Sequence, residues 1–206
     1  MLTHLRPTLV LTTALTVVTG LAYPLAMTGL AGTLFPAKAA GSLVERDGVV
    51  VGSALIGQSF TGERYFHGRP SATTAPDPAD ATKTVAAPYN AANSGGSNLG
   101  PTSQALRDRV ADDLARLKSE NPAAPVPMDL VTTSGSGLDP DISPEAALFQ
   151  APRIARTRGL PEDRVRDLVA AQTQDRLLGI LGEPRVNVLA LNLALDAQAG
   201  QVRTGR

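Results

Sequence analysis

The sequence contains no cysteine and no tryptophan, and aromatic residues make up only 3% of it. Without cysteine the chain can form neither disulfide bonds nor thiolate metal sites. The charge is also balanced, since 19 lysines and arginines accompany 19 aspartates and glutamates. A neutral chain gives no reason to expect nucleic acid or an anionic surface as a partner. A core built from alanine, valine and leucine with so few aromatics is thin, which favours support from a partner protein.

One long stretch lacks charge altogether, because no charged side chain occurs between Arg6 and Lys38. A bilayer core needs about 20 apolar helical residues, so we predict a transmembrane helix over residues 8–30, with residues 1–7 in the cytoplasm. A cleaved signal peptide is the alternative, because residues 37–39 (Ala-Lys-Ala) resemble a cleavage site. However, the apolar run is roughly twice the length of a signal core and ends well before that site, which favours a retained helix.

The orientation of this helix is poorly marked by charge. Arg6 lies at one end, whereas Lys38 and Arg46 lie several residues beyond the other. The positive-inside rule is therefore nearly balanced. Long C-terminal domains translocate largely regardless of charge, which favours a cytoplasmic N-terminus and an external domain.

Small or ring-closed residues recur at every fourth position of the helix: Thr8, Thr12, Thr16, Gly20, Pro24, Thr28 and Gly32. Membrane helices associate through close packing of small residues and threonine hydroxyl groups. We therefore predict that a row centred on Thr12, Thr16 and Gly20 packs against another transmembrane helix. Such a row drifts by about 40° per step, so a straight partner follows only part of it. The alternative is that these residues are simply common in membrane helices.

The remaining chain predicts an α+β fold, in which the single transmembrane helix is followed by one mixed α/β domain. We expect a tether over residues 31–47, the domain over 48–196 and a flexible tail over 197–206. Hydrophobic periodicity and capping residues predict helices over 103–120, 143–158 and from 161 to 179 or 182. Strands are expected over 48–56, 129–133 and 186–195.

Two of these predictions are specific. Gly52 is expected to mark a turn or bulge in the strand or hairpin at 48–56. Residues 186–195 are apolar at nearly every position, and Asn187 and Asn192 would lie on opposite faces of a strand. This pattern predicts a central strand buried on both faces. Residues 71–100 are too long for an ordinary connection and indicate a functional or partner-ordered loop.

Two stretches rich in glycine and serine each precede a predicted helix, at residues 94–102 and 134–144. The first almost matches a phosphate-binding P-loop, with Gly95, Gly100 and Thr102 correctly spaced. Pro101, however, stands where the phosphate-contacting lysine is required. Proline offers neither the positive charge nor a backbone N–H, so this interpretation is rejected.

Other catalytic motifs also fail. A G-x-S-x-G hydrolase elbow is broken by Leu99, and His67 is the only histidine beyond the membrane segment that could serve as a base. Asp139 and Asp141 suggest a metal site, but no further ladder of ligands follows them. Turns shaped by their carboxylates explain these two residues more simply. We predict no active site, no metal site and no directly bound cofactor.

Both stretches are instead typical of loops with a fixed shape. Glycine allows positive φ angles, while Ser, Asn and Asp side chains cross-link the backbone. We predict that these loops dock onto another protein, and small-anion binding at the following helix N-termini is the alternative. The predicted docking residues are Ser94, Gly95, Gly96, Ser97, Asn98, Gly100, Ser134, Gly135, Ser136, Gly137, Asp139 and Asp141.

The chain resembles the C-subunit family of the bacterial Kdp high-affinity potassium-transporting ATPase. The matching blocks occur in family order: GSALIGQSF (52–60), YFHGRPSA (65–72), YNAANSGGSNLGPTS (89–103), VTTSGSGLDPDISPEAALFQAPRIARTRGL (131–160) and LGEPRVNVLALNLAL (181–195). They cover essentially the whole chain except its tail. Ser103 stands where the family often has asparagine, which is a minor departure.

The resemblance implies a non-catalytic, single-pass subunit of the bacterial cell (inner) membrane, with its C-terminal domain on the extracytoplasmic side. In that family a potassium-channel-like subunit and a P-type ATPase subunit handle potassium and ATP. The C subunit is needed for assembly and is described as a catalytic chaperone that raises the affinity for ATP. An external domain without a phosphate cradle could act on ATP only indirectly. The alternative is an independent membrane-anchored envelope enzyme or small-ligand binding protein.

Overall fold

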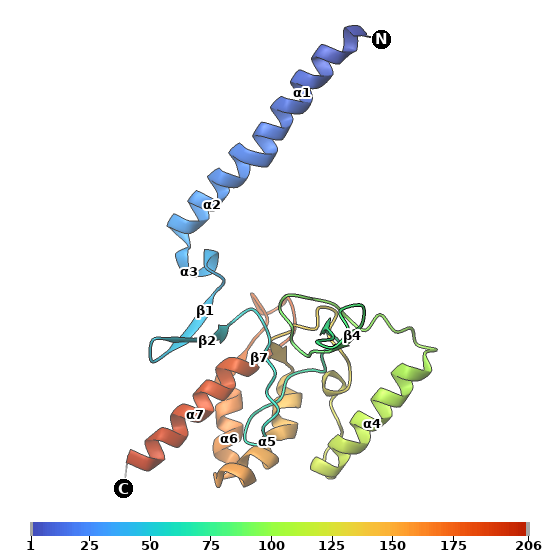
Figure 1. Cartoon of the computed structure of the whole chain (residues 1–206). Helices are drawn as coiled ribbons and strands as arrows, with labels where there is room; N and C mark the ends of the chain where they lie inside the picture. Colours follow the sequence, from blue (N-terminus) through green and yellow to red (C-terminus); the bar gives the residue numbers. More distant parts are fainter. Residues whose placement is uncertain (1, 205–206) are drawn as a thin grey trace. The chain divides into compact units, whose positions relative to one another are not determined.

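The computed structural model describes residues 2–204, and the side chains of residues 3–198. It divides into two compact units, Met1–Ser53 and Ala54–Arg206. The first contains a long apolar helix, and the second contains most of the helices and strands (Figure 1). The chain thus has one N-terminal apolar helix followed by a mixed α/β region, as the sequence predicts.

The apolar helix extends beyond the predicted bounds. After a 3-10 turn (η1, Leu2–His4) it comprises α1 (Leu5–Val17), η2 (Val18–Ala22) and α2 (Tyr23–Leu34). The 30 residues from Leu5 to Leu34 are long and apolar enough to cross a membrane, and none of them is buried within the chain. In lipid a helix satisfies its own backbone groups, so such exposure is what a bilayer-spanning segment requires.

The middle of this helix is a π-helical segment, η2, in place of the continuous α-helix expected from the sequence. Pro24 is the second residue of α2, which follows η2 directly. Proline lacks an N–H group, and in an α-helix its ring clashes with the carbonyl four residues earlier, here that of Gly20. A wider turn relieves this clash, and π-bulges are a known cause of local irregularity in helices. Pro24 was the sequence signal for it.

The predicted tether contains secondary structure. A short helix, α3 (Pro36–Ala39), precedes an antiparallel hairpin of β1 (Leu43–Arg46) and β2 (Val49–Ser53). The hairpin turns at Asp47 and Gly48, whose φ angles are 53° and 77°. Positive φ at both central residues is typical of the type I′ turn, for which Asp-Gly is a preferred sequence. The register shifts next to the pair of Val44 and Gly52, so of the two alternatives predicted for Gly52, a turn or a bulge, the structure has the bulge.

The second unit is built around a small sheet and a group of helices. Its strands and helices are β3 (Thr74–Pro76), β4 (Thr84–Ala86), α4 (Gln104–Glu120), η3 (Met128–Leu130), β5 (Asp141–Ile142), α5 (Pro144–Arg158), α6 (Glu162–Gln172), β6 (Thr173–Gln174), β7 (Arg185–Asn187) and α7 (Val188–Thr204). β3 pairs with β4, and β7 lies between β5 and β6, all antiparallel. Helices α5, α6 and α7 lie together, and α4 lies apart from them (Figure 1).

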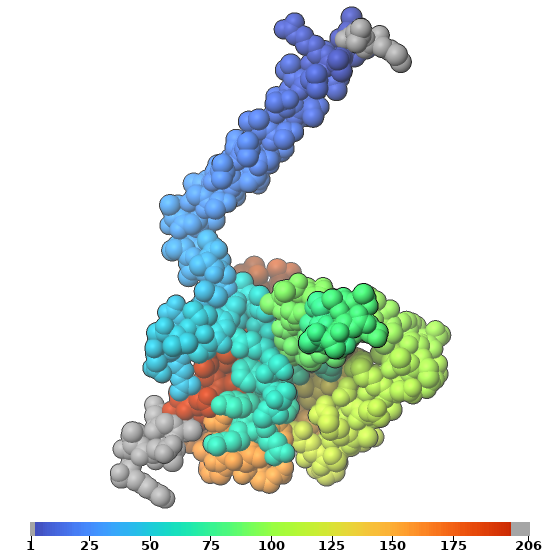
Figure 2. Space-filling view, in the orientation of Figure 1, coloured from blue at the N-terminus to red at the C-terminus, as the bar shows by residue number. Residues whose placement is uncertain are grey.

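The hydrophobic core lies among α5, α6, α7 and β7. Fully buried side chains come from all four elements: Ile154, Val165, Val186, Leu191 and Leu195. The loop that contains Phe66 closes one side of this core. Its backbone is held by Asn192, which accepts from Phe66 N at 2.8 Å and donates to Phe66 O at 3.0 Å. The segment around residues 60–75, teal in Figure 2, crosses the surface between the red α7 and the yellow-green α4.

Two predicted helices are confirmed together with their caps. Ser103 caps α4, and its hydroxyl accepts from Leu106 N at 3.4 Å. Ser143 caps α5 by accepting from Ala146 N at 3.0 Å, and Gly159 ends α5 with a φ of 67°. A serine cap contributes about 1 kcal/mol to a helix. Local signals of this strength explain why these boundaries could be predicted.

The predicted strand over residues 186–195 is wrong beyond its first two residues. β7 ends at Asn187, whose side chain accepts from Ala190 N at 3.0 Å in the manner of a helix cap, and α7 follows. The buried side chains Val188, Leu191 and Leu195 recur at helical spacing. An apolar run fits a buried helix as well as a buried strand, and the asparagine cap decides between them.

Two further predictions are corrected. Residues 129–133 form no strand; η3 covers Met128–Leu130, and Asp129 accepts from the Ser143 amide at 2.8 Å. The helix predicted to reach residue 179 or 182 ends at Gln172, where the chain enters β6. The helix α7 continues to Thr204 through part of the predicted tail, and residues 205–206 lie outside the described residues.

Candidate docking site

The structure brings the two glycine- and serine-rich stretches into direct contact. Gly95 N donates to Ser136 O at 2.8 Å, and the hydroxyl of Ser94 donates to the same carbonyl at 3.0 Å. A third contact joins the hydroxyl groups of Thr133 and Ser97 at 3.2 Å. Loops that lie about 40 residues apart in the sequence therefore form one surface, which we call the loop platform (residues 94–100 and 134–141).

Two glycines permit this close approach. A Cβ atom at Gly96 would lie 3.0 Å from Gly135 O. Gly137 has a φ of 68°, and a Cβ atom there would lie 2.7 Å from Gly95 O and closer still to the methyl group of Thr73. Side chains other than hydrogen would therefore push the two loops apart. Gly96 and Gly137 therefore serve loop-to-loop packing, in addition to the backbone freedom inferred from the sequence.

A third segment, residues 69–73, supports the platform from below. The Ser71 hydroxyl donates to Gly137 O at 2.7 Å and accepts from Tyr89 N at 3.0 Å. The Tyr89 hydroxyl donates to Arg69 O at 2.6 Å. Burial raises the pKa of Tyr89 to about 12, so this hydroxyl remains a donor at physiological pH. No local sequence pattern predicts this role for Arg69, Ser71 or Tyr89, although all three lie in the blocks that carry the resemblance.

Asp139 and Asp141 shape the second loop. Asp139 forms an ion pair with Arg69 at 2.8 Å and accepts from Asp141 N at 3.1 Å, which is the carboxylate turn expected from the sequence. Asp141 accepts from Asn187 at 3.2 Å and lies 3.2 Å from Arg185. Burial raises its pKa, while the contacts to Asn187 and Arg185 act in the opposite direction. Among the described residues, no group of three or more His, Asp or Glu side chains is placed to hold a metal ion.

The other predicted docking residues are either wholly or partly buried, where they support the platform, or exposed on its surface. Ser134 and Gly137 are buried, and the chain from Gly95 to Ser97 is half-buried. Five predicted residues are exposed and form the accessible part of the platform: Ser94, Asn98, Gly100, Gly135 and Ser136. The platform therefore presents serine hydroxyls, one asparagine amide and backbone groups, which suits hydrogen bonding to a polar protein surface.

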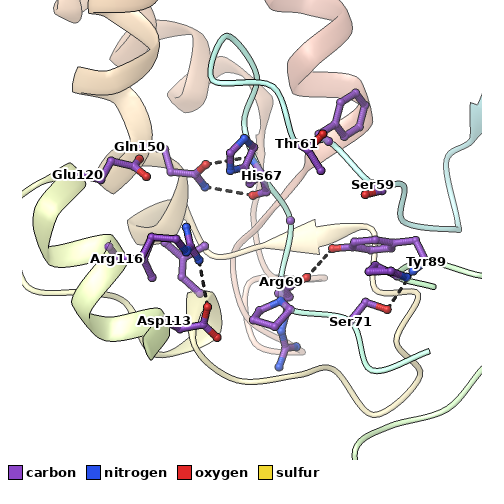
Figure 3. A pocket seen from close by; sticks show the side chains of 16 residues that line it. Ser59, Thr61, His67, Arg69, Ser71, Tyr89, Asp113, Arg116, Glu120 and Gln150 are labelled. Carbon is purple, nitrogen blue, oxygen red and sulfur yellow. Dashed lines mark hydrogen bonds and ion pairs between the residues drawn. The ribbon is translucent and has the colours of Figure 1, made fainter. Parts of the chain in front are cut away.

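A pocket of about 440 Å³ lies beside the platform (Figure 3). Figure 3 shows Tyr89 and Ser71 on one side, and Glu120, Arg116 and Gln150 on the other. Arg116 is paired with Asp113 at 3.1 Å. The His67 ring lies 3.0 Å from Gly62 O and so is engaged by the backbone. Burial lowers the pKa of His67, and the hydrogen bond to Gly62 offsets this only in part.

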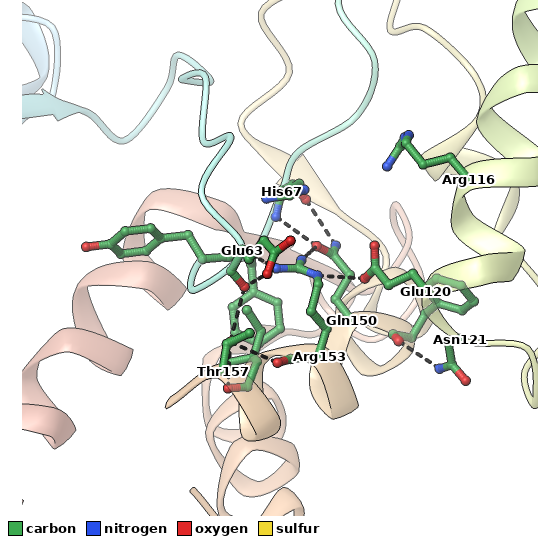
Figure 4. A network of polar contacts seen from close by, with 12 residues as sticks. Glu63, His67, Arg116, Glu120, Asn121, Gln150, Arg153 and Thr157 are labelled. Carbon is green, nitrogen blue, oxygen red and sulfur yellow. Dashed lines mark hydrogen bonds and ion pairs between the residues drawn. The ribbon is translucent and has the colours of Figure 1, made fainter. Parts of the chain in front are cut away.

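A buried polar network supports the pocket from the side of helices α4 and α5 (Figure 4). Arg153 donates to Glu120 at 2.7 Å, to Gln150 at 2.8 Å and to the backbone carbonyls of Glu63 and Tyr65. Gln150 in turn accepts from His67 N at 2.8 Å and donates to His67 O at 3.1 Å. These contacts hold the loop that carries His67 in place, so the role of the network is structural.

The three predicted membrane-packing residues lie in the other unit. Thr12 is in α1, and Thr16 and Gly20 follow it along the exposed surface of the apolar helix. A Cβ atom at Gly20 would meet only the methyl group of Thr16, at 4.0 Å. This side of the helix therefore has room for the close approach of another backbone.

The chain is similar to known proteins over nearly its whole length. Residues 5–197 match the family described as KdpC, the c chain of the K+-transporting ATPase. The chain belongs to the KdpC family. It is 80% identical to the potassium-transporting ATPase KdpC subunit of Methylobacterium nodulans, over 98% of this chain and all of that protein. It is 80% identical to the KdpC subunit of Methylorubrum extorquens over 95% of this chain and 97% of that one.

A third relative, the KdpC subunit of Bradyrhizobium diazoefficiens, is 70% identical over 98% of this chain and all of its own length. Both the apolar helix and the loop platform lie within the matched residues. As a KdpC-family chain, the protein is a subunit of a K+-transporting ATPase, and its apolar helix agrees with a membrane subunit of that pump.

Proposed function

We propose that this chain is a non-catalytic accessory subunit that assembles and stabilises the potassium pump. The proposal is supported by family membership together with one structural observation, the loop platform. Its two stretches and the segment beneath them hold each other through hydrogen bonds, so the exposed serine and asparagine groups have fixed positions. A surface ordered before binding loses little conformational entropy when it docks.

The partners in this proposal are the potassium-channel-like subunit and the P-type ATPase subunit of the same pump. The apolar helix packs against a transmembrane helix through Thr12, Thr16 and Gly20. The mixed α/β unit lies on the extracytoplasmic side, where it covers the entry for potassium. This orientation is supported by the family resemblance and by the length of the chain after the helix.

An influence on ATP affinity belongs to this proposal only in an indirect form. Pro101 occupies the position of a P-loop lysine, and Arg107, the next cation along the chain, donates to Thr102 O at 2.9 Å. An external domain and cytoplasmic ATP are also separated by the membrane. An effect on ATP affinity then requires that the subunit bind one conformation of its partners more tightly than another. The change in ATP affinity is limited by that difference in binding free energy.

The test is purification of the tagged full-length chain in mild detergent from cells that express the complete pump. We expect the channel-like and ATPase subunits to be recovered with it, and we expect the chain alone to have no ATPase activity. Recovery as a free monomer, with the other subunits present in the same membranes, would overturn the proposal. Removal of the subunit from a purified pump should raise the ATP concentration needed for half-maximal activity.

A further inference from the structure

The loop between β6 and β7 exposes an unusual concentration of large aliphatic side chains. Leu177, Leu178, Ile180 and Leu181 are 68%, 82%, 77% and 55% exposed. Single exposed leucines are common on protein surfaces, but four within five residues form a contiguous apolar patch. Patches of this kind mark interaction sites in soluble regions. We call residues 176–183 the apolar hairpin.

The apolar hairpin is a closed structure. Leu177 N donates to Leu181 O at 2.9 Å, and Leu181 N donates to Leu177 O at 3.0 Å. Below this pair, Arg176 and Glu183 form an ion pair at 2.5 Å. The aliphatic side chains are thus presented on a small hairpin with its own hydrogen bonds.

The residue at the tip of the hairpin, Leu178, is of a type that disfavours the backbone conformation found there. Leu178 and Gly179 have φ angles of 55° and 76°, so both central residues of the turn are left-handed. Asparagine followed by glycine is the preferred sequence for such a turn, and leucine is disfavoured at the first position. Leu178 has an unfavourable backbone conformation and is 82% exposed, so it does not contribute to the hydrophobic core of the chain. Local conflicts of this kind are expected where a residue serves binding.

We infer that the apolar hairpin inserts Leu178 and Ile180 into an apolar pocket on another subunit of the same pump. The inference rests on the proposed function, because family membership establishes that this chain is one subunit among others. The charges of Arg176 and Glu183 cancel, and Asp175 precedes them, so the segment has no basic excess. It also has no aromatic residue. Membrane-surface segments typically combine basic side chains with interfacial aromatics, whereas a rigid aliphatic tip suits a pocket in a protein.

The experiment compares Leu178→Asn and Ile180→Asn with Met128→Asn in the tagged full-length chain, expressed with the complete pump. Met128 is 75% exposed on η3 and serves as the matched control. Asparagine favours the left-handed backbone at position 178, so Leu178→Asn should keep or raise the thermal midpoint of the chain. We expect recovery of the other subunits to fall about tenfold for each hairpin variant and to be unchanged for Met128→Asn.

A photo-reactive residue at position 178 identifies what the tip touches. The expected product is a covalent adduct with another pump subunit. An adduct with lipid alone, or with a second copy of this chain, would overturn the inference. Unchanged subunit recovery by both hairpin variants would overturn it as well. Failure of the wild-type chain to recover any pump subunit is a separate result, which would contradict the proposed function itself.

Discussion

The guanidinium of Arg153 and the carboxylate of Glu120 join helix α5 to the last turn of α4. Their Nε and Oε1 atoms are 2.7 Å apart, and the two side chains are only 6% and 14% exposed. Helix α4 otherwise buries fully only Leu117. A charged pair with little access to water is therefore a main link between α4 and the rest of the second unit.

Breaking this pair should destabilise the second unit. Glu120→Ala leaves the Arg153 cation buried without its carboxylate, and removal of one partner from a buried pair costs about 3–5 kcal/mol. Glu162→Ala is the matched control, because its pair with Arg166 is about half exposed and worth at most about 1 kcal/mol. Chemical unfolding of the full chain in detergent, followed by circular dichroism, measures both. Equal losses would show that burial of the first pair has no energetic consequence.

Substitution of Gly137 should disrupt the loop platform. Gly137→Ala adds a methyl group at a φ of 68°, against Gly95 O and Thr73, and should cost at least about 2 kcal/mol of unfolding free energy. Gly135→Ala, two residues earlier, meets no atom within 4 Å and should change stability by less than about 0.5 kcal/mol. If docking uses the platform, Gly137→Ala should reduce the recovery of other pump subunits. This reduction should exceed the loss of folded chain that its lower stability causes.

The small-residue row on the apolar helix predicts a selective assembly defect. Thr16→Leu with Gly20→Leu fills the space for a partner helix at two exposed positions and keeps the segment apolar. Ala14→Leu with Ala22→Leu makes the same kind of change on the opposite side of the helix. Membrane insertion should be normal for both. Subunit recovery should fall only for the first pair, and equal recovery would exclude the row as the packing face.

The stability of the second unit should decrease as the pH falls through the range of His67. Burial lowers the pKa of folded His67 below 6.5, so the unfolded chain binds the proton first. The contribution of neutral His67 to the free energy of unfolding is then fully present above about pH 7. Below that pH it declines, by at most about 1.4 kcal/mol per pH unit. His67→Gln should flatten this slope. Asp141 contributes with the opposite sign, because burial raises its pKa, but it is common to both proteins.

The absence of cysteine makes the orientation directly measurable. Single cysteines at Lys83 and at Thr3 report on the two sides of the apolar helix, and the Lys83 side chain is 72% exposed. In intact cells with a permeable outer membrane, a charged maleimide should label Lys83→Cys readily. Thr3→Cys should react only after the inner membrane is opened. The reverse pattern would place the α/β unit in the cytoplasm.

The helices with strong local signals could be predicted well from the sequence. Ser103 and Ser143 are good caps, and Gly159 provides a left-handed end, so α4 and α5 were placed within a residue or two. The prediction failed where local signals were ambiguous. Residues 186–195 are apolar at nearly every position, and either a helix or a strand would bury such a run against α5 and α6. The Asn187 cap is the feature that selects the helix.

The sequence by itself determined the presence of the apolar helix, the absence of disulfide and thiolate chemistry, and the loops that carry the family resemblance. These features depend on composition or on residues close together in the chain. Only the tertiary structure decided that the two loops lock together, that Ser71 and Tyr89 support them, and that the apolar hairpin stays uncovered. Such contacts join residues that are distant in the sequence, as Arg69 and Asp139 are at 70 positions apart, and depend on how the whole chain packs. No local pattern records that packing.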